Sequence, residues 1–321
     1  MALGLAGCGY PGDPLPPALN IPERISDLRA LQRGSRLLVA LTLPLTTTDR
    51  LVLPQPPALE LFAGPAPEGE FNAEAWAATA EMVTREAGGD AEIVIELPAT
   101  RWAGREIVLG ARAIGRTGRR SAWSNLVVLP VVPPLPVPEG LRARATPEGV
   151  YLEWNPGAGP EGRLWRVYRK APGEEEFSLL GRAAEPSWLD RGIRFGESYT
   201  YLLQTILPAG DGEAEGEPGP PLTVEPRDTF PPAAPTGFTA IAGVNSIELA
   251  WERSPEPDFA AYQLFRAEAD GALSAFGDPL SALSFSDTSV ISGRRYRYAL
   301  AARDLAGNLS PLTEPIEITA P

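Results

Sequence analysis

Residues 149–154 read Gly-Val-Tyr-Leu-Glu-Trp, and residues 246–251 read Ser-Ile-Glu-Leu-Ala-Trp. In both stretches every second residue is a large apolar one. Side chains of a β-strand point alternately to opposite faces of a sheet, so a period of two predicts a strand with one buried face. The two buried faces would be formed by Val150, Leu152 and Trp154, and by Ile247, Leu249 and Trp251.

The two stretches belong to an internal repeat with a constant offset of 97 positions. The same offset joins Pro138 to Pro235, Gly140 to Gly237, Tyr168 to Phe265, Arg169 to Arg266, Trp188 to Phe285, Asp190 to Asp287, Gly196 to Gly293, Tyr199 to Tyr296, Tyr201 to Tyr298 and Leu203 to Leu300. This is the length of an independent sandwich domain and exceeds the roughly 20–50 residues of a solenoid unit. The fold class predicted is therefore all-β, with several β-sandwiches in tandem.

The repeated motifs are Pro-x-Gly-[Leu/Phe]-x-Ala, [Val/Ile]-x-Leu-x-Trp, Ser-[Trp/Phe]-x-Asp and Gly-x-x-Tyr-x-Tyr, and together they resemble bacterial fibronectin type III modules. The resemblance implies immunoglobulin-like sandwiches in which Trp154 and Trp251 are core residues of the second strand. It also implies that Tyr199 and Tyr296 form the tyrosine corner, with Tyr201 and Tyr298 in the core. Residues 301–310 resemble the hairpin between the last two strands.

Residues 23–132 form a looser third copy. We expect its first strand at 25–30, its second at Leu37, Val39 and Leu41, and its third at 59–62. Ile107 stands where the other copies have the corner tyrosine. Residues 71–87 have helical propensity, which predicts a short helix or a disordered insertion. Residues 121–125 resemble the entry to the last strand.

The predicted layout has four parts, which are a truncated signal segment with a proline-rich tether (1–22), a divergent fibronectin type III-like sandwich (23–132), and two fibronectin type III modules (133–229 and 230–321). Prolines are dense at 130–138 and 226–235, where they remove backbone donors and stiffen the chain. A semi-rigid rod is expected.

Cys8 ends the stretch Leu5-Ala6-Gly7-Cys8, which resembles the lipobox of bacterial lipoproteins. The resemblance implies that Cys8 becomes the first mature residue and carries a lipid. Only seven residues precede it, fewer than a full signal peptide has, so a chance match with a free cysteine is the alternative. The proline-rich residues 10–22 suit an extended membrane tether.

Composition removes several classes of function. The chain has no histidine, which excludes Ser-His-Asp and Cys-His catalysis and histidine metal ligands. Its single cysteine allows no intrachain disulfide. The net charge of −13 and the absence of basic clusters with aromatics argue against a nucleic-acid partner and against anionic lipid surfaces. No cofactor or metal motif is present, and no catalytic residues are assigned.

Two tryptophans outside the repeat, Trp76 and Trp165, are weak candidates for an exposed ligand-binding surface, although burial is favoured for each. The acidic runs 174–176 and 211–217 match no calcium-loop spacing, so solvated hairpin tips are preferred to a Ca²⁺ site.

Three functions remain open. The first is a non-catalytic spacer and protein-interaction scaffold, lipid-anchored in the bacterial cell envelope through Cys8, whose partner is another envelope protein. The second is a polysaccharide-binding accessory protein that contacts a surface glycan. The third, least favoured, is a hydrolase whose carboxylates are not recognised, because no paired carboxylates stand out.

Overall fold

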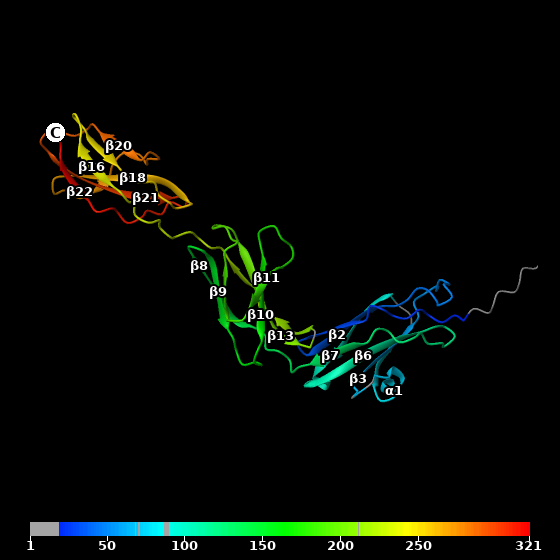
Figure 1. Cartoon of the computed structure of the whole chain (residues 1–321). Helices are drawn as coiled ribbons and strands as arrows, with labels where there is room; N and C mark the ends of the chain where they lie inside the picture. The colour runs from blue at the N-terminus through cyan, green and yellow to red at the C-terminus, as the bar shows by residue number, and fades with distance from the viewer. Residues whose placement is uncertain (1–18, 68, 70, 87–89, 211) are drawn as a thin grey trace, which may run out of the picture. The chain divides into compact units, whose positions relative to one another are not determined.

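A computed structural model describes residues 19–321, except 68, 70, 87–89 and 211 (Figure 1). Contacts divide the chain into two compact units, residues 1–143, 152–188 and 199–224 in one and residues 144–151, 189–198 and 225–321 in the other. This division passes through the second of the three predicted sandwiches, so the units do not coincide with the predicted domains. We keep the term module for each set of strands that one sequence copy supplies.

The first module pairs a three-stranded arm with a four-stranded sheet. The arm has the order β1-β2-β5, and the sheet has the order β4-β3-β6-β7. Its elements are β1 (Arg29–Arg33), β2 (Arg36–Thr42), β3 (Ala58–Pro65), α1 (Ala73–Ala77), β4 (Glu81–Glu86), β5 (Glu92–Pro98), the 3-10 helix η1 (Ala99–Arg101), β6 (Arg105–Ile114) and β7 (Val127–Val131).

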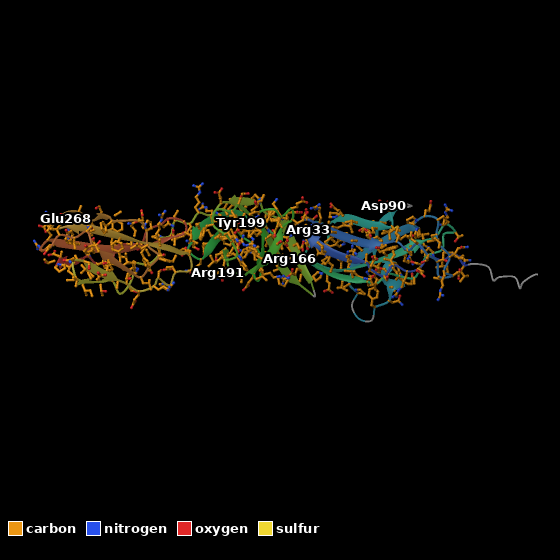
Figure 2. The ribbon with its side chains drawn as sticks, turned by 90° about the horizontal axis from the view of Figure 1, so that it is seen from above. Arg33, Asp90, Arg166, Arg191, Tyr199 and Glu268 are labelled. Carbon is orange, nitrogen blue, oxygen red and sulfur yellow. The ribbon has the colours of Figure 1, made fainter. Side chains whose placement is uncertain are left out.

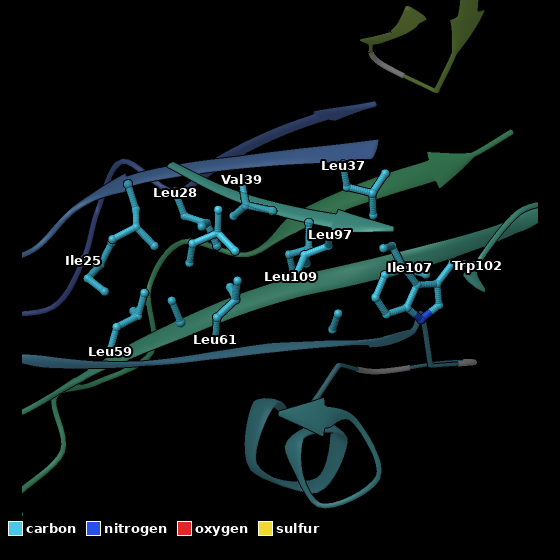
Figure 3. Close-up of a cluster of buried hydrophobic side chains, with 14 of the residues drawn as sticks. Ile25, Leu28, Leu37, Val39, Leu59, Leu61, Leu97, Trp102, Ile107 and Leu109 are labelled. Atoms are coloured by element: carbon cyan, nitrogen blue, oxygen red, sulfur yellow. The ribbon is translucent and has the colours of Figure 1, made fainter. Parts of the chain in front are cut away.

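The alternation of apolar residues along each strand decides which face of each sheet is buried in this module. Leu37, Val39 and Leu41 of β2 are all buried, and they pack with residues of β3 and β6 in one core (Figure 3). Ile107, which replaces the corner tyrosine, is fully buried in the same core. The second and third strands therefore form where the sequence predicts them.

Two expectations for the first module are corrected. The first strand begins at Arg29 rather than at residue 25, although Ile25 and Leu28 are buried in the core. The short helix expected within 71–87 forms at Ala73–Ala77, capped by Asn72 accepting from the Ala75 N–H at 3.0 Å, and the second correction concerns residues 81–86. Residues 81–86 form β4 because its backbone pairs with β3, which overrides the local propensity.

The second module supplies β8 (Glu139–Thr146), β9 (Gly149–Asn155), β10 (Leu164–Lys170), β11 (Ser178–Ala183), β12 (Ser187–Asp190), β13 (Tyr199–Ala209), β14 (Gly212–Pro218) and β15 (Leu222–Val224). One sheet has the order β12-β9-β8, and the other begins β11-β10-β13-β14. The second sheet continues from β14 into β1 and ends at β5 of the first module, so one sheet of eight strands serves two modules.

The third module supplies β16 (Thr239–Ala242), β17 (Ile247–Ala250), β18 (Phe259–Glu268), β19 (Ser274–Ala275), β20 (Ser284–Asp287), β21 (Arg295–Asp304) and β22 (Ile316–Thr319). Its two sheets have the orders β16-β17-β20 and β19-β18-β21-β22. Trp251, which directly follows β17, shares one core with Tyr262, Tyr296 and Tyr298 of the second sheet.

Every copy thus places its first, second and fifth strands in one sheet and the others in a second sheet. This confirms the predicted fold class, tandem immunoglobulin-like β-sandwiches of the fibronectin type III kind. Among the described residues, no helix combines the length and the apolar character needed to cross a membrane.

Candidate functional site

The junction of the first two modules is the most elaborate polar site among the described residues. Strand β1 lies parallel to β14, with Gln32 opposite Ala214 and Arg33 opposite Glu215. The Gly34 N–H donates to the Glu215 carbonyl at 2.7 Å. An unpaired strand edge exposes backbone donors and acceptors, and here each module satisfies the edge of the other.

Gln32 fixes the start of the connection between the modules. Its side chain is buried, with Nε2 donating to the Val132 carbonyl at 2.8 Å and Oε1 accepting from the Val132 N–H at 3.0 Å. Further along, the Thr205 hydroxyl donates to the Pro136 carbonyl at 2.8 Å. The predicted linker is therefore bonded at both ends, and Pro130 lies within β7 rather than in the linker.

Glu215 joins cations from both modules. Arg33 donates to its Oε2 from Nε at 3.0 Å and from Nη2 at 2.8 Å, while Arg166 of β10 donates from Nη1 to Oε1 at 2.6 Å. Figure 2 labels Arg33 and Arg166 at this junction. The Glu215 side chain is buried, and Gln204 Nε2 contributes a further contact at 3.3 Å.

The ion pairs continue along both sides of Glu215. Arg166 also binds Glu213, which Arg182 contacts at 2.7 Å. On the first module, Arg36 binds Glu217 at 2.9 Å and Glu96 at 3.0 Å. These ion pairs form a network in which the glutamates of β14 bind arginines of both modules. We call this network, together with the β1–β14 pairing, the seam.

Opposing effects set the charge of Glu215. Burial disfavours the carboxylate, but the hydrogen bonds from Arg166 and Arg33 outweigh this, so the pKa of Glu215 lies below its ordinary value. For Arg166, burial also opposes the charge, yet the bonds to Glu215 and Glu213 raise its pKa above the ordinary value. Both groups remain ionised at neutral pH, which keeps the network charged.

The sequence did not identify this junction, and it assigned residues 211–217 to a solvated hairpin tip. Residue 211 lies outside the described residues, but Glu213 and Glu215 are paired with arginines, which corrects the expectation for them. The available signal was the alternation of Glu213, Glu215 and Glu217, since a period of two indicates a strand. The other acidic run, 174–176, is exposed.

The two weak ligand-binding candidates are both buried. Trp76 packs edge-on against Trp123 with ring centroids 5.9 Å apart, and Trp165 packs against Trp154 at 5.7 Å. Burial was the favoured interpretation for each, and neither presents a face to a ligand. They lie in different modules, so the fold does not bring them together.

The six residues assigned to the core by resemblance are all buried, namely Trp154, Trp251, Tyr199, Tyr201, Tyr296 and Tyr298. The Tyr296 hydroxyl accepts from the Ile291 N–H at 3.0 Å, which is the backbone partner expected of a tyrosine corner. The Tyr298 hydroxyl donates to Asp287 Oδ2 at 2.6 Å. Cys8, the predicted lipid attachment site, lies outside the described residues.

A second acidic group lies in the unit that contains the third module. One carboxylate oxygen each from Asp228, Asp258 and Asp304 lies within 4.8 Å of the others. Asn308 contacts this group, because its Nδ2 donates to Asp304 Oδ2 at 2.8 Å and to the Asp228 backbone carbonyl at 3.3 Å. These bonds attach residue 228 to the turn that follows β21.

Comparisons with known proteins give partial matches. No family model matches it. It is 28% identical over 194 residues to Exoglucanase B of Cellulomonas fimi, which covers 57% of this chain and 16% of that protein. It is 28% identical over 88 residues to an amylopullulanase of Thermoanaerobacterium saccharolyticum, covering 27% and 7%. It is 29% identical over 126 residues to the human collagen alpha-1(XX) chain, covering 39% and 9%.

The chain therefore spans only a small part of each of these relatives. Among solved structures, the chicken CNTN1 FN1–FN3 domains match 93% of this chain and 99% of that chain, with 15% identity and a TM-score of 0.31. At that score the likeness adds nothing to the fold, which rests on the strand order given above.

Proposed function

We propose that this chain is a non-catalytic spacer and protein-interaction scaffold whose first two modules act as one stiff unit. The observation that carries the proposal is the parallel pairing of β1 with β14, which continues one sheet across the junction. A flexible linker lets neighbouring modules reorient, whereas a shared sheet with a charged seam holds them in one arrangement. A spacer must hold its two ends at a fixed distance, and a stiff junction between the modules supports that role.

The scaffold acts at the bacterial cell envelope, anchored through a lipid on Cys8. The support is the Leu5-Ala6-Gly7-Cys8 sequence and the proline-rich residues after it. Its partner is another envelope protein, bound at the exposed strand edges and loops. The net charge of −13 argues against nucleic acid as the partner.

Two spin labels test the stiffness directly. Cys8 is the only cysteine, so a Cys8→Ser chain accepts labels at Val94→Cys and Leu179→Cys, two exposed positions on β5 and β11. We expect a narrow distance distribution that broadens when Arg33→Ala and Glu215→Ala are added. A distribution that is broad already without those substitutions would contradict the stiff unit.

Intact-mass spectrometry of the membrane fraction tests the anchor. A diacylated or triacylated chain that begins at Cys8 supports it, and loss of the acyl mass in Cys8→Ser is the control. An unmodified chain that begins at Met1 in the soluble fraction would exclude it. The spin-label result is independent of this outcome.

The names of two relatives, an exoglucanase and an amylopullulanase, favour a second candidate, a polysaccharide-binding accessory role. Such binding usually needs exposed aromatic rings. In the described part of the chain, Phe71 is the one exposed aromatic residue. Pull-down with insoluble β-glucan and α-glucan tests this candidate. Binding that Phe71→Ala abolishes would favour it over the protein scaffold.

A further inference from the structure

Three segments meet at the end of the first module that lies away from the junction. Strand β2 leads into the loop 43–57, β6 leads into the loop after residue 114, and the described chain begins beside both (Figure 1). The backbone of Thr46 pairs with that of Val52, which makes residues 45–53 a small hairpin. We call residues 19–23, 45–53 and 115–119 the N-terminal tip.

Hydrogen bonds hold the segments of the N-terminal tip together. The Leu19 N–H donates to Asp49 Oδ2 at 2.7 Å, and the Thr48 N–H donates to the Ile21 carbonyl at 2.8 Å. Arg119 Nη1 donates to the Leu19 carbonyl at 2.9 Å. The tip is therefore a defined surface made of three parts of the sequence.

The tip exposes apolar side chains that its neighbours leave uncovered. Val52 is 79% exposed, Leu19 and Leu45 are each 49% exposed, and Leu51 is 46% exposed. The Thr46–Val52 backbone pair places Val52 on one face of the hairpin and Leu45 and Leu51 on the other, so exposed aliphatic side chains project from both faces of its end. Clustered exposed aliphatic residues indicate a contact surface, whereas single ones are ordinary.

The tip is also locally basic in an acidic protein. Arg50, Arg116 and Arg119 are exposed there. The tip also holds Asp49, which accepts from the Leu19 and Asn20 N–H groups, and Glu23, which accepts from the Thr46 hydroxyl, so its three arginines outnumber its two carboxylates. A hollow of about 400 Å³ opens next to the tip, lined by Pro54, Pro56, Ile114 and Arg116 among others. Aliphatic side chains flanked by arginines suit the interface of an anionic bilayer.

We infer that the N-terminal tip contacts the surface of an anionic lipid bilayer, with Leu45, Leu51 and Val52 entering the interface and the arginines binding headgroup phosphates. This rests on the proposed anchor at Cys8, because it is the anchor that brings the bilayer near. Ten residues separate Cys8 from Leu19, so even a fully extended chain holds the tip within about 40 Å of the anchored residue. The overall negative charge, which argues against lipid binding by the whole protein, is outweighed locally at this surface.

Vesicle cosedimentation of the full-length Cys8→Ser chain tests the tip without any acyl chain. The probes are vesicles of phosphatidylethanolamine with phosphatidylglycerol, and vesicles of phosphatidylcholine alone. We expect binding to the anionic vesicles that weakens as salt rises. Leu51→Glu with Val52→Glu should lower the partition about tenfold or more. Arg50→Gln with Arg116→Gln should lower only the binding to anionic vesicles.

The matched control is Val244→Glu with Leu305→Glu, which adds the same charge at two aliphatic positions of the third module that are, as a pair, at least as exposed as those of the tip. It should leave the partition unchanged, and thermal melts confirm that each variant folds. No binding to anionic vesicles, or equal losses in the tip and control variants, would overturn the inference. If the Cys8→Ser chain binds anionic vesicles but the native chain carries no acyl group, the proposed lipid anchor is contradicted and the inference about the tip still holds.

Discussion

Arg33 and Glu215 are joined through both backbone and side chain. They are register partners in adjacent parallel strands, and Arg33 Nη2 and Nε donate to Glu215 Oε2 at 2.8 and 3.0 Å. The backbone pairing sets the register, and the side-chain pair favours that register over a slip by one residue. A slip would turn Glu215 to the opposite face of the sheet, away from both arginines. The pair thus specifies the junction as well as stabilising it.

Removing Glu215 should loosen the first unit. In Glu215→Ala, Arg33 and Arg166 lose their shared buried carboxylate, so we expect the free energy of unfolding to fall by about 3 kcal/mol. The control is Glu217→Ala, whose side chain is 39% exposed beside Arg36, with an expected loss below about 1 kcal/mol. Urea unfolding followed by tryptophan fluorescence measures both. Equal losses would show that the seam is no stronger than a surface ion pair.

Asp287 should make the stability of the third module depend on acid. Burial opposes its charge, but bonds from Tyr298, Ser289 and Arg266 outweigh burial and hold the pKa of Asp287 below its ordinary value of 3.8. Because the folded pKa is the lower one, its contribution is fully present above pH 3.8 and is lost as the pH falls through the folded pKa. Unfolding midpoints measured against pH should decline more gently in Asp287→Asn than in the wild-type chain. The exposed Asp270→Asn is the control and should keep the wild-type slope.

Tyr296 tests the tyrosine corner. Tyr296→Phe removes the acceptor of the Ile291 N–H and keeps the ring, so we expect a loss of about 1–2 kcal/mol from one unpaired backbone donor. The half-buried Tyr151→Phe should cost less than about 0.5 kcal/mol. Chemical denaturation of the two variants gives the comparison. A cost for Tyr296→Phe no larger than that of Tyr151→Phe would mean that the hydroxyl contributes nothing.

Gly149, the first residue of β9, constrains the backbone there. Its φ is 144°, and an added Cβ would lie 2.0 Å from the Asp190 carbonyl oxygen, so Gly149→Ala must displace a strand. We expect a loss of about 3 kcal/mol or more. Gly196→Ala, with φ of 82° and nothing within 4 Å of its Cβ, should cost about 1 kcal/mol from the left-handed backbone alone. Thermal unfolding of the two variants separates steric overlap from backbone strain, and similar losses would refute the overlap.

Local patterns determined what the sequence could predict. Trp154 lies in β9 and Trp251 directly follows β17, and both are buried because alternation and a fixed offset specify a strand and its buried face. Residues 81–86 were missed because pairing with β3 decided their conformation against local propensity. The seam was missed for a stronger reason. Gln32 and Ala214 are far apart in the sequence, and each strand alone shows nothing of its partner.

The shared sheet also bears on how such a chain can be rearranged. The second and third modules are related by one offset, which suggests pieces that could be copied and exchanged freely. Strand β14 carries three alternating glutamates, of which Glu215 and Glu217 bind arginines of the first module, whereas β22 of the third module reads Ile-Glu-Ile-Thr. A third module placed beside the first would leave Arg33 without its carboxylate and β1 without its neighbour. An exchange that separated the first two modules would therefore break the β1–β14 pairing and the ion pairs beside it.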